Sequence, residues 1–351
     1  MTSTASHLPA LKGGLLALLA AALFGVSTPL VQKLGLGLGP FTTSALLYAG
    51  AALVGALLRR PVEKEARLRR SDLPRLLAVA LFGALIAPVA MAWGLQRSSG
   101  TGASLLLTLE ALFTAVLAWR FYGETMDRRV WSALLLLLAG GITLVLDQGQ
   151  GGGSQLWGLL AVLLATAAWG MDNSLSRALA ERDPAQVVLA KALLGASATG
   201  GLAWLSGEAL PGWGPALGLL AVGATGYGLS LRFYLLAQRA FGAARTGSVF
   251  AFAPFIGAAL ALALGDRSGG WGLLLGGGLM LAGVLVHLAE SHEHEHAHEA
   301  LEHEHAHTHD DGHHDHEHEP MPAGPHSHPH RHPALRHKHA HVPDLHHRHT
   351  H

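Results

Sequence analysis

The sequence predicts an all-α integral membrane protein in which ten transmembrane helices form two inverted repeats of five, followed by a disordered C-terminal tail. Three observations lead to this fold class. Of the 351 residues, 50% are hydrophobic and only 14% are charged. The apolar residues gather in ten runs that are long enough to cross a bilayer. Parts of the first half of the chain also recur in the second half.

The composition excludes several classes of protein. Ahead of the last 61 residues, about 57% of the chain is apolar, against roughly 45–50% in globular domains, so an ordinary soluble domain is excluded. The 44 glycines are typical of closely packed membrane helices. Without cysteine, the chain has no disulfide, thiolate zinc site or cysteine nucleophile. No basic stripe with interleaved aromatic residues occurs, and we predict no nucleic-acid partner.

The ten apolar runs predict ten spans, because a helix needs about 20 apolar residues to cross the hydrocarbon core and satisfies its own backbone there. The first run follows Lys12 and resembles a secretory signal, but its recurrence later in the chain argues against that interpretation. The runs cover approximately residues 13–31, 41–58, 75–96, 102–120, 130–146, 156–176, 185–205, 215–236, 244–264 and 270–289.

An internal repeat is the most specific feature of the sequence. Shifting residues 15–40 by 145 positions aligns Phe24-Gly25 with Trp169-Gly170, with 8 of 26 positions identical. A shift of 142 aligns QRSSG at Gln96 with QRAFG at Gln238, and Gly-Glu with Gly-Asp, without a gap over 29 positions. We therefore predict repeats at 11–146 and 156–289, a glycine-rich linker at 147–155 and a tail at 290–351.

The distribution of Lys and Arg predicts the orientation. Five spans per half bring the second half into the membrane from the opposite side, so the repeat is inverted. With the N-terminus inside, the cytoplasmic segments contain 15 Lys and Arg, and the outer segments contain three. We expect a multi-pass protein of the plasma or bacterial inner membrane, with both termini cytoplasmic. Lys191 and Arg232 fall inside predicted helices near their cytoplasmic ends, where we expect them to snorkel to the headgroups.

These features resemble the EamA branch of the drug/metabolite transporter superfamily. The resemblance rests on ten helices, the five-plus-five repeat, the aromatic-Gly pairs, and a fourth run that reads SLLLTLEALFTAVLAWRFYGE. It implies a secondary transporter, typically an exporter of amino acids, metabolites or toxic compounds, with a central cavity between the halves. The family often has Pro where Ala111 follows Glu110, and usually Trp where this chain has Phe24. These two departures leave the shape of the cavity open.

Aromatic-glycine pairs mark the expected binding region. Inverted-repeat transporters bind near the membrane midplane, where helices are interrupted. Phe24-Gly25 and Trp169-Gly170 lie near the middle of their helices, and the inverted symmetry places them on opposite sides of one cavity. The alternative is that these pairs only allow close helix packing. Further candidates for the cavity are Trp93 and Tyr227, which otherwise face lipid or core, and Asp172 and Asn173, which otherwise form a polar helix end.

Glu110 is the carboxylate at the centre of a predicted span. A charge at this depth costs about 2.5–3.5 kcal/mol, so something must offset that cost. In a water-filled cavity, Glu110 would bind an amino group of a small-molecule substrate or exchange a proton, with protons as the coupling ion. The alternative is a permanently protonated Glu that bonds to a neighbouring helix.

The tail contains 23 of the 25 histidines, alternating with Glu and Asp in its first part. Such a polar stretch predicts disorder without a ligand. Imidazoles and carboxylates at short spacing suit Zn, Ni, Co or Cu, while a response to pH is the competing interpretation. No cofactor is required. The metal-ligand candidates are His292, His294, His296, His298, His303, His305, His307, His309, His313, His314, His316 and His318.

Transport is favoured over catalysis, because the longest loop of the body covers only residues 59–74. Two substrate classes remain open. The resemblance and the weakly charged midplane favour an organic metabolite, such as an amino acid. The tail favours export of a divalent cation (Ni, Co or Zn), which the tail would collect. The body lacks a membrane-embedded His or paired-carboxylate site, since His287 lies near the end of the last run and Glu110 stands alone, and this favours the metabolite. A third alternative is a metal-buffering protein whose body only anchors it in the membrane. The inverted repeat argues against it, because an anchor does not need one.

Overall fold

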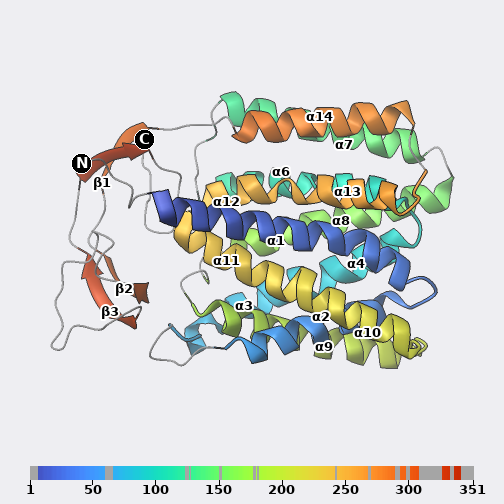
Figure 1. Ribbon diagram of the computed structural model, residues 1–351, viewed down its shortest axis with the longest axis horizontal. Helices are drawn as coiled ribbons and strands as arrows, with labels where there is room; N and C mark the ends of the chain where they lie inside the picture. Colours follow the sequence, from blue (N-terminus) through green and yellow to red (C-terminus); the bar gives the residue numbers. More distant parts are fainter. Residues whose placement is uncertain are drawn as a thin grey trace.

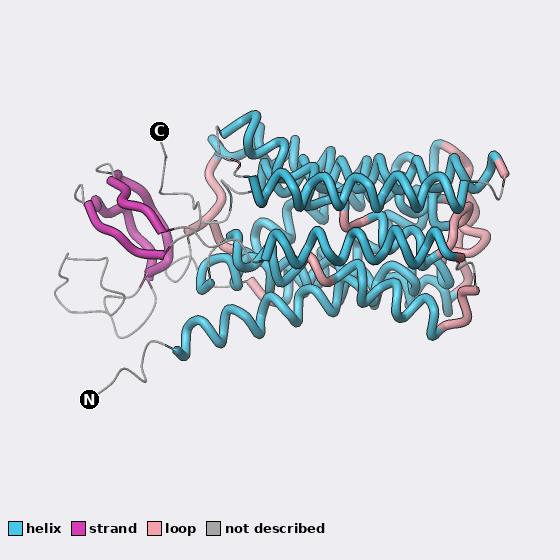
Figure 2. Tube along the Cα trace, turned by 90° about the horizontal axis from the view of Figure 1, so that it is seen from above, coloured by secondary structure: helices cyan, strands magenta, loops and turns pink. Residues whose placement is uncertain are grey.

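The computed structural model describes residues 7–59, 66–122, 126, 128–149, 152–176, 179, 182–241, 243–267 and 270–288, together with four short segments of the C-terminal tail. Within these residues, ten helices are long and apolar enough to cross a membrane. They run along a common direction and form a bundle (Figure 1, Figure 2). The predicted fold class of the body, an all-α membrane protein with ten spans, is confirmed.

Six spans are continuous α-helices. They are α1 (His7–Leu34), α2 (Pro40–Leu57), α7 (Arg128–Gly149), α8 (Gly153–Ser176), α9 (Pro184–Leu205) and α14 (Trp271–Leu288).

The other four spans are interrupted, and their interruptions come in matching pairs. The third span comprises η2 (Arg70–Asp72), α3 (Leu73–Ala80), the π-helical segment η3 (Leu81–Ile86) and α4 (Ala87–Leu95). The eighth comprises α10 (Trp213–Val222), the π-helical segment η5 (Gly223–Leu229) and α11 (Ser230–Phe241). The fourth breaks between α5 (Gly100–Leu106) and α6 (Leu109–Tyr122), and the ninth between α12 (Ala243–Phe250) and α13 (Ala253–Ala263).

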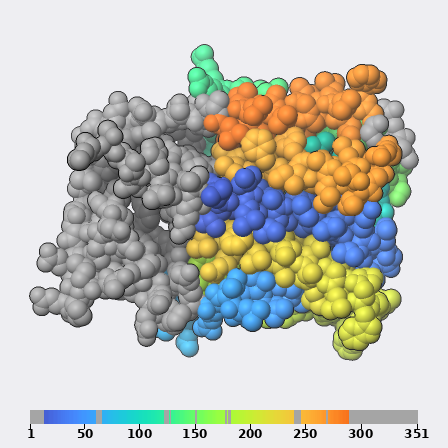
Figure 3. Space-filling model, viewed as in Figure 1, coloured from blue at the N-terminus to red at the C-terminus, as the bar shows by residue number. Residues whose placement is uncertain are grey.

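The packing of the helices follows the inverted repeat. The two π-helical segments begin 142 positions apart, which is the shift found in the sequence. Equivalent helices pack against each other in two places, α2 on α9 and α7 on α14. Helix α1 packs on α11 and α13, as its equivalent α8 packs on α4 and α6. In the space-filling view, the blue surface of α1 is flanked on both sides by yellow to orange surface of the second half (Figure 3).

Local chemistry explains where several helices begin. Pro40 and Pro184 occupy the first turns of α2 and α9, where the missing N–H costs nothing. The Asp183 carboxylate accepts a hydrogen bond from the backbone N of Ala185 at 2.9 Å and caps α9. The N-terminus of α2 is capped from the other half of the chain, because the Glu208 carboxylate accepts from the backbone N of residue 42 at 2.7 Å.

The glutamine of the repeated Gln-Arg motif joins the first and third spans. Gln96 Nε2 donates to the carbonyl oxygen of Leu38 at 2.7 Å. In return, Gln32 Nε2 on α1 donates to the carbonyl oxygens of Leu95 and Ser98, both at 2.9 Å. Since each amide satisfies carbonyls at the end of the other span, the two spans are tied together where the chain leaves the bundle.

The described segments of the tail form four short strands. Strand β1 (Glu293–Ala297) pairs antiparallel with β4 (Arg336–Ala340), and β2 (Leu301–His307) with β3 (His326–His332). The alternation of residue types has the period of a strand. The register also sets acidic positions opposite basic ones, Glu295 with Lys338 and Glu302 with Arg331. The strands lie beyond the end of the bundle at which α1 begins (Figure 1).

Of the predicted metal ligands, five lie on described strands and seven do not. His294 and His296 are on β1, and His303, His305 and His307 are on β2. The remaining candidates lie outside the described residues, namely His292, His298, His309, His313, His314, His316 and His318.

The crossing of α7 and α14 generates a test of the packing. A β-carbon at Gly276 would lie 2.9 Å from the Gly140 carbonyl oxygen, whereas one at Gly278 would have no neighbour within 4 Å. Gly276→Ala should therefore lower the stability by about 1–3 kcal/mol. Gly278→Ala should be neutral or slightly stabilising, because Ala is the better helix former by about 1 kcal/mol. Thermal unfolding of the purified proteins measures the difference; identical melting of both variants would contradict the proposed tight crossing.

Candidate substrate cavity

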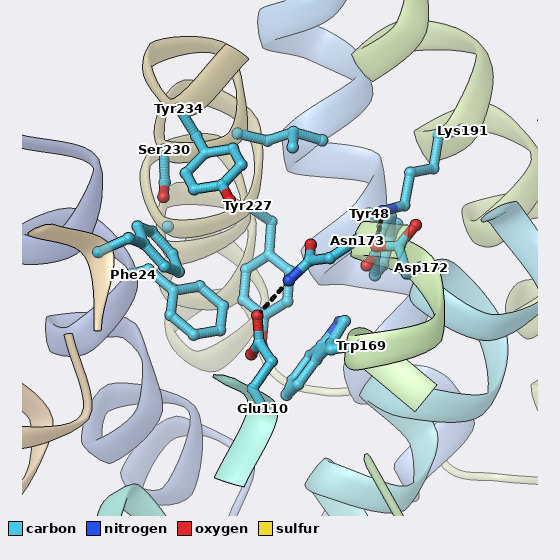
Figure 4. A pocket seen from close by; sticks show the side chains of 13 residues that line it. Phe24, Tyr48, Glu110, Trp169, Asp172, Asn173, Lys191, Tyr227, Ser230 and Tyr234 are labelled. Atoms are coloured by element: carbon cyan, nitrogen blue, oxygen red, sulfur yellow. Dashed lines mark hydrogen bonds and ion pairs between the residues drawn. The ribbon is translucent and has the colours of Figure 1, made fainter. Parts of the chain in front are cut away.

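A cavity of about 70 Å³ lies between the two halves (Figure 4). A water molecule needs roughly 10–15 Å³ on this measure, so the cavity has room for several waters. Both repeats supply its walls. The lining residues are Phe24, Tyr48 and Glu110 from the first half, and Trp169, Asp172, Asn173, Lys191, Gly226, Tyr227, Ser230, Leu231, Tyr234 and Phe250 from the second.

An aromatic cluster forms much of the wall. The repeat-equivalent residues Phe24 and Trp169 meet edge to face, with ring centroids 5.6 Å apart. Tyr227 lies 6.0 Å from Phe24, 6.4 Å from Trp169 and 5.7 Å from Tyr48, measured between ring centroids. Phe250 contacts Phe24 at 5.5 Å. Edge-to-face contacts, which Phe24 makes with Trp169 and Tyr227, are favourable, and exposed aromatic faces attract apolar or cationic groups.

The two π-helical segments border this cavity. A π-helical turn leaves backbone carbonyls without their usual partners and is frequent at functional sites. In η3, the Gly83 carbonyl oxygen accepts from Trp169 Nε1 at 3.3 Å and from the Tyr48 hydroxyl. In η5, Gly226 and Tyr227 line the cavity directly. The interruptions of the third and eighth spans therefore orient the aromatic side chains.

Glu110 lies in the first turn of α6, directly after the break in the fourth span. A carboxylate at this place is favoured by the helix dipole. Asn173 Nδ2 donates to Glu110 Oε1 at 2.5 Å, which joins α6 to α8. Glu110 therefore bonds to a neighbouring helix and also lines the cavity. This geometry fits both a structural role and a role in binding substrate or protons.

Lys191 corrects a prediction. From the sequence we expect Lys191 to snorkel to the headgroups, but it is only 5% exposed and forms an ion pair with Asp172, which is 4% exposed. A second oxygen of Asp172 accepts from Ser176 Oγ at 3.2 Å. A buried ammonium is tolerated when a carboxylate compensates its charge. The partner lies 19 positions earlier on another helix, so helical spacing within one span does not reveal it.

The structure brings six of the predicted site residues to the cavity and places three elsewhere. Phe24, Glu110, Trp169, Asp172, Asn173 and Tyr227 line it. Gly25 and Gly170 lie at helix crossings beside it: a β-carbon at Gly25 would collide with the Ala253 carbonyl oxygen, and one at Gly170 would lie 2.7 Å from Phe113 Cβ. Trp93 is outside the lining, with the Arg97 guanidinium 3.8 Å from its ring centroid.

Seven lining residues are not among the site residues predicted from the sequence, namely Tyr48, Lys191, Gly226, Ser230, Leu231, Tyr234 and Phe250. One signal was present. The chain has four tyrosines, and three of them, Tyr48, Tyr227 and Tyr234, line the cavity. A phenol inside an apolar run needs a hydrogen-bond partner for its hydroxyl, so isolated tyrosines in predicted spans indicate a polar region inside the bundle.

Metal ligands do not gather in the described part of the chain. Among the residues for which the structure gives side chains, no three of His, Cys, Asp or Glu lie close enough together to hold a metal ion. The cavity itself offers two carboxylates, one ammonium, one amide and several phenols. This arrangement suits hydrogen bonding to a small polar molecule with an apolar portion.

Ten apolar spans, matching interruptions in two inverted halves and a cavity between those halves define a multi-pass membrane transport protein. The chain belongs to the EamA-like transporter family, whose model matches residues 11–146 and 156–289.

Two further proteins are similar to this chain. A protein of Methanothermobacter thermautotrophicus described as an uncharacterized transporter is 28% identical over 262 residues, which cover 68% of this chain and 75% of that protein. A protein of known crystal structure has a similar fold, with a TM-score of 0.57 and 19% identity, covering 78% of this chain and 94% of the other.

Proposed function

We propose that this protein is a secondary transporter, not an enzyme, and that it exports a small metabolite such as an amino acid or a related compound. One observation carries the proposal: the cavity between the repeats combines an aromatic cluster with the carboxylate of Glu110. Among the described residues, Glu110 bonds to an amide but to no cation. The apolar part of a substrate would pack on the rings, and its amino group would neutralise Glu110.

Glu110 also offers a means of coupling. A carboxylate can hold a proton or a substrate ammonium, but a protonated carboxyl no longer attracts the ammonium. Proton uptake and substrate binding would then exclude each other, which is the condition for exchanging a metabolite for protons. Acidification of the substrate-loading side should accordingly weaken substrate binding.

Glu110→Gln tests this function. The amide keeps the hydrogen bond to Asn173 but lacks the charge, and a lost charge-assisted contact of about 1.5–3 kcal/mol lowers substrate binding roughly ten- to hundredfold. Transport into proteoliposomes, screened with amino acids, should fall accordingly, and its dependence on pH should flatten. Glu208→Gln serves as a control outside the cavity, since Glu208 follows α9 and its carboxylate caps the N-terminus of α2. Wild-type transport by Glu110→Gln would reduce Glu110 to a packing residue.

We further propose that both termini are cytoplasmic, because this orientation retains 15 Lys and Arg inside and three outside. Reporter fusions after Gln148 and Gly207 should then report an external position. Fusions after Arg70 and after the tail should report an internal one. An external C-terminus would overturn the orientation.

The tail supports a second candidate function, export of a divalent cation, because 23 histidines lie in the last 61 residues. Under the favoured function, the tail binds Zn, Ni, Co or Cu and regulates a metabolite exporter. Under the alternative, it collects cations for transport.

Removing residues 291–351 separates the two functions. A metabolite exporter should keep its basal transport and lose only a response to metal. A cation exporter should need a higher concentration for half-maximal transport. Uptake by proteoliposomes is measured with amino acids and with divalent metals, for the intact and the truncated protein. Metal transport by the truncated protein, with no response to organic substrates, would favour the alternative.

A further inference from the structure

Lys191 has hydrogen-bonding capacity that the folded chain does not use. An ammonium carries three N–H donors. Among the described residues, Lys191 Nζ makes one hydrogen bond, to Asp172. The side chain lines the cavity and is only 5% exposed, so the other two donors are left to water inside the cavity or to a group that enters it. A buried donor that is left unsatisfied is costly, and its natural partner is a group that enters the cavity.

The carboxylate of Glu110 lies in another part of the same cavity. Asp172 and Asn173 are neighbours on α8, and successive helical residues point about 100° apart. Asn173 therefore reaches Glu110, while Asp172 reaches Lys191. Figure 4 shows Glu110 and Lys191 well separated in this view, with Asn173 between them. Glu110 and Lys191, which are opposite in charge, thus bond to two different residues of α8 and do not pair with each other.

We propose that Lys191 determines specificity by binding a carboxylate of the substrate, so that the cavity selects a zwitterion whose ammonium binds Glu110. The proposal rests on the function proposed above and adds a second point of recognition to it. The two spare donors of Lys191 match the two oxygens of a carboxylate. A zwitterion adds no net charge to the cavity, and it supplies a partner for Glu110 and a second partner for Lys191.

Asp172 has a defined part in this arrangement. It compensates the charge of Lys191 while the cavity is empty, and Ser176 holds its other oxygen. Lys191 need not leave Asp172 when substrate binds, because its remaining donors are free for the second carboxylate. An amine without a carboxylate would leave those donors unserved, which is the basis for discrimination between the two kinds of molecule.

A purely structural role for the ion pair is the competing explanation, because Asp172 and Lys191 join α8 to α9. Removing one partner leaves an uncompensated buried charge and destabilises the protein whether or not Lys191 binds substrate. Replacing both partners by neutral residues of similar size is often tolerated. The double variant Asp172→Asn/Lys191→Met therefore separates the two roles. The charge-exchanged variant Asp172→Lys/Lys191→Asp keeps the pair but moves the ammonium to α8.

The experiment compares binding of molecules that differ only in a carboxylate. Titration calorimetry on the purified full-length protein uses two pairs of ligands, leucine with 3-methylbutylamine and phenylalanine with 2-phenylethylamine. Wild-type protein should bind the amino acid of at least one pair about tenfold or more tightly than its amine. Both paired variants should lose this preference, Lys191→Arg should retain it, and Lys33→Met, at the end of α1, should leave it unchanged.

Each outcome decides the proposal. Loss of the preference in a variant that still elutes as a folded protein supports it. Equal binding of amine and amino acid by wild-type protein overturns it, while the proposed metabolite function stands. A preference that survives in either paired variant also overturns it and leaves the ion pair structural. Binding of neither ligand class by wild-type protein overturns both this proposal and the metabolite function.

Discussion

A hydrocarbon layer offers no water to a polar group, so each interrupted helix and each buried charge in this protein needs a partner from the chain itself. The interruptions at η3 and between α5 and α6 meet this constraint at the cavity. The first directs a carbonyl at Tyr48 and Trp169, and the second places Glu110 at the start of a helix. The cavity lies where the helices can be interrupted while their backbone groups still find hydrogen-bond partners.

Much of the fold was predictable because apolar run length and internal repetition depend on local sequence alone. The site was predictable where the repeat marked it, as at Phe24 and Trp169, and where a charge stood alone in a span, as at Glu110. Lys191 was not, since its partner Asp172 is brought close only by the packing of α8 on α9. The aromatic-glycine pairs predicted the cavity only in part. Their rings line it, whereas their glycines allow close contact between helices.

The symmetry of the fold does not extend to the chemistry of the cavity. The shift of 145 aligns Asp172 with Ser27, and the shift of 142 aligns Glu110 with Phe252. Ser27 is buried and donates to the Phe24 carbonyl oxygen at 2.6 Å within its own helix. Each charged group thus has an uncharged counterpart in the other repeat. The two repeats therefore give the shared cavity an asymmetric set of charges, which a symmetric pair could not provide.

The Gly83 carbonyl has a mechanical consequence. One oxygen atom binds Tyr48 on α2 and Trp169 on α8, while it belongs to the third span itself. Three spans are therefore joined at a single point, and sliding one of them past the others would break one of these two hydrogen bonds. The other walls, which include Phe24 on α1, Tyr234 on α11 and Phe250 on α12, have no share in this anchor. That side has a tie of its own, because the Ser230 hydroxyl on α11 donates to the Ala20 carbonyl oxygen on α1 at 2.9 Å, so neighbouring spans are joined by hydrogen bonds on both sides of the cavity.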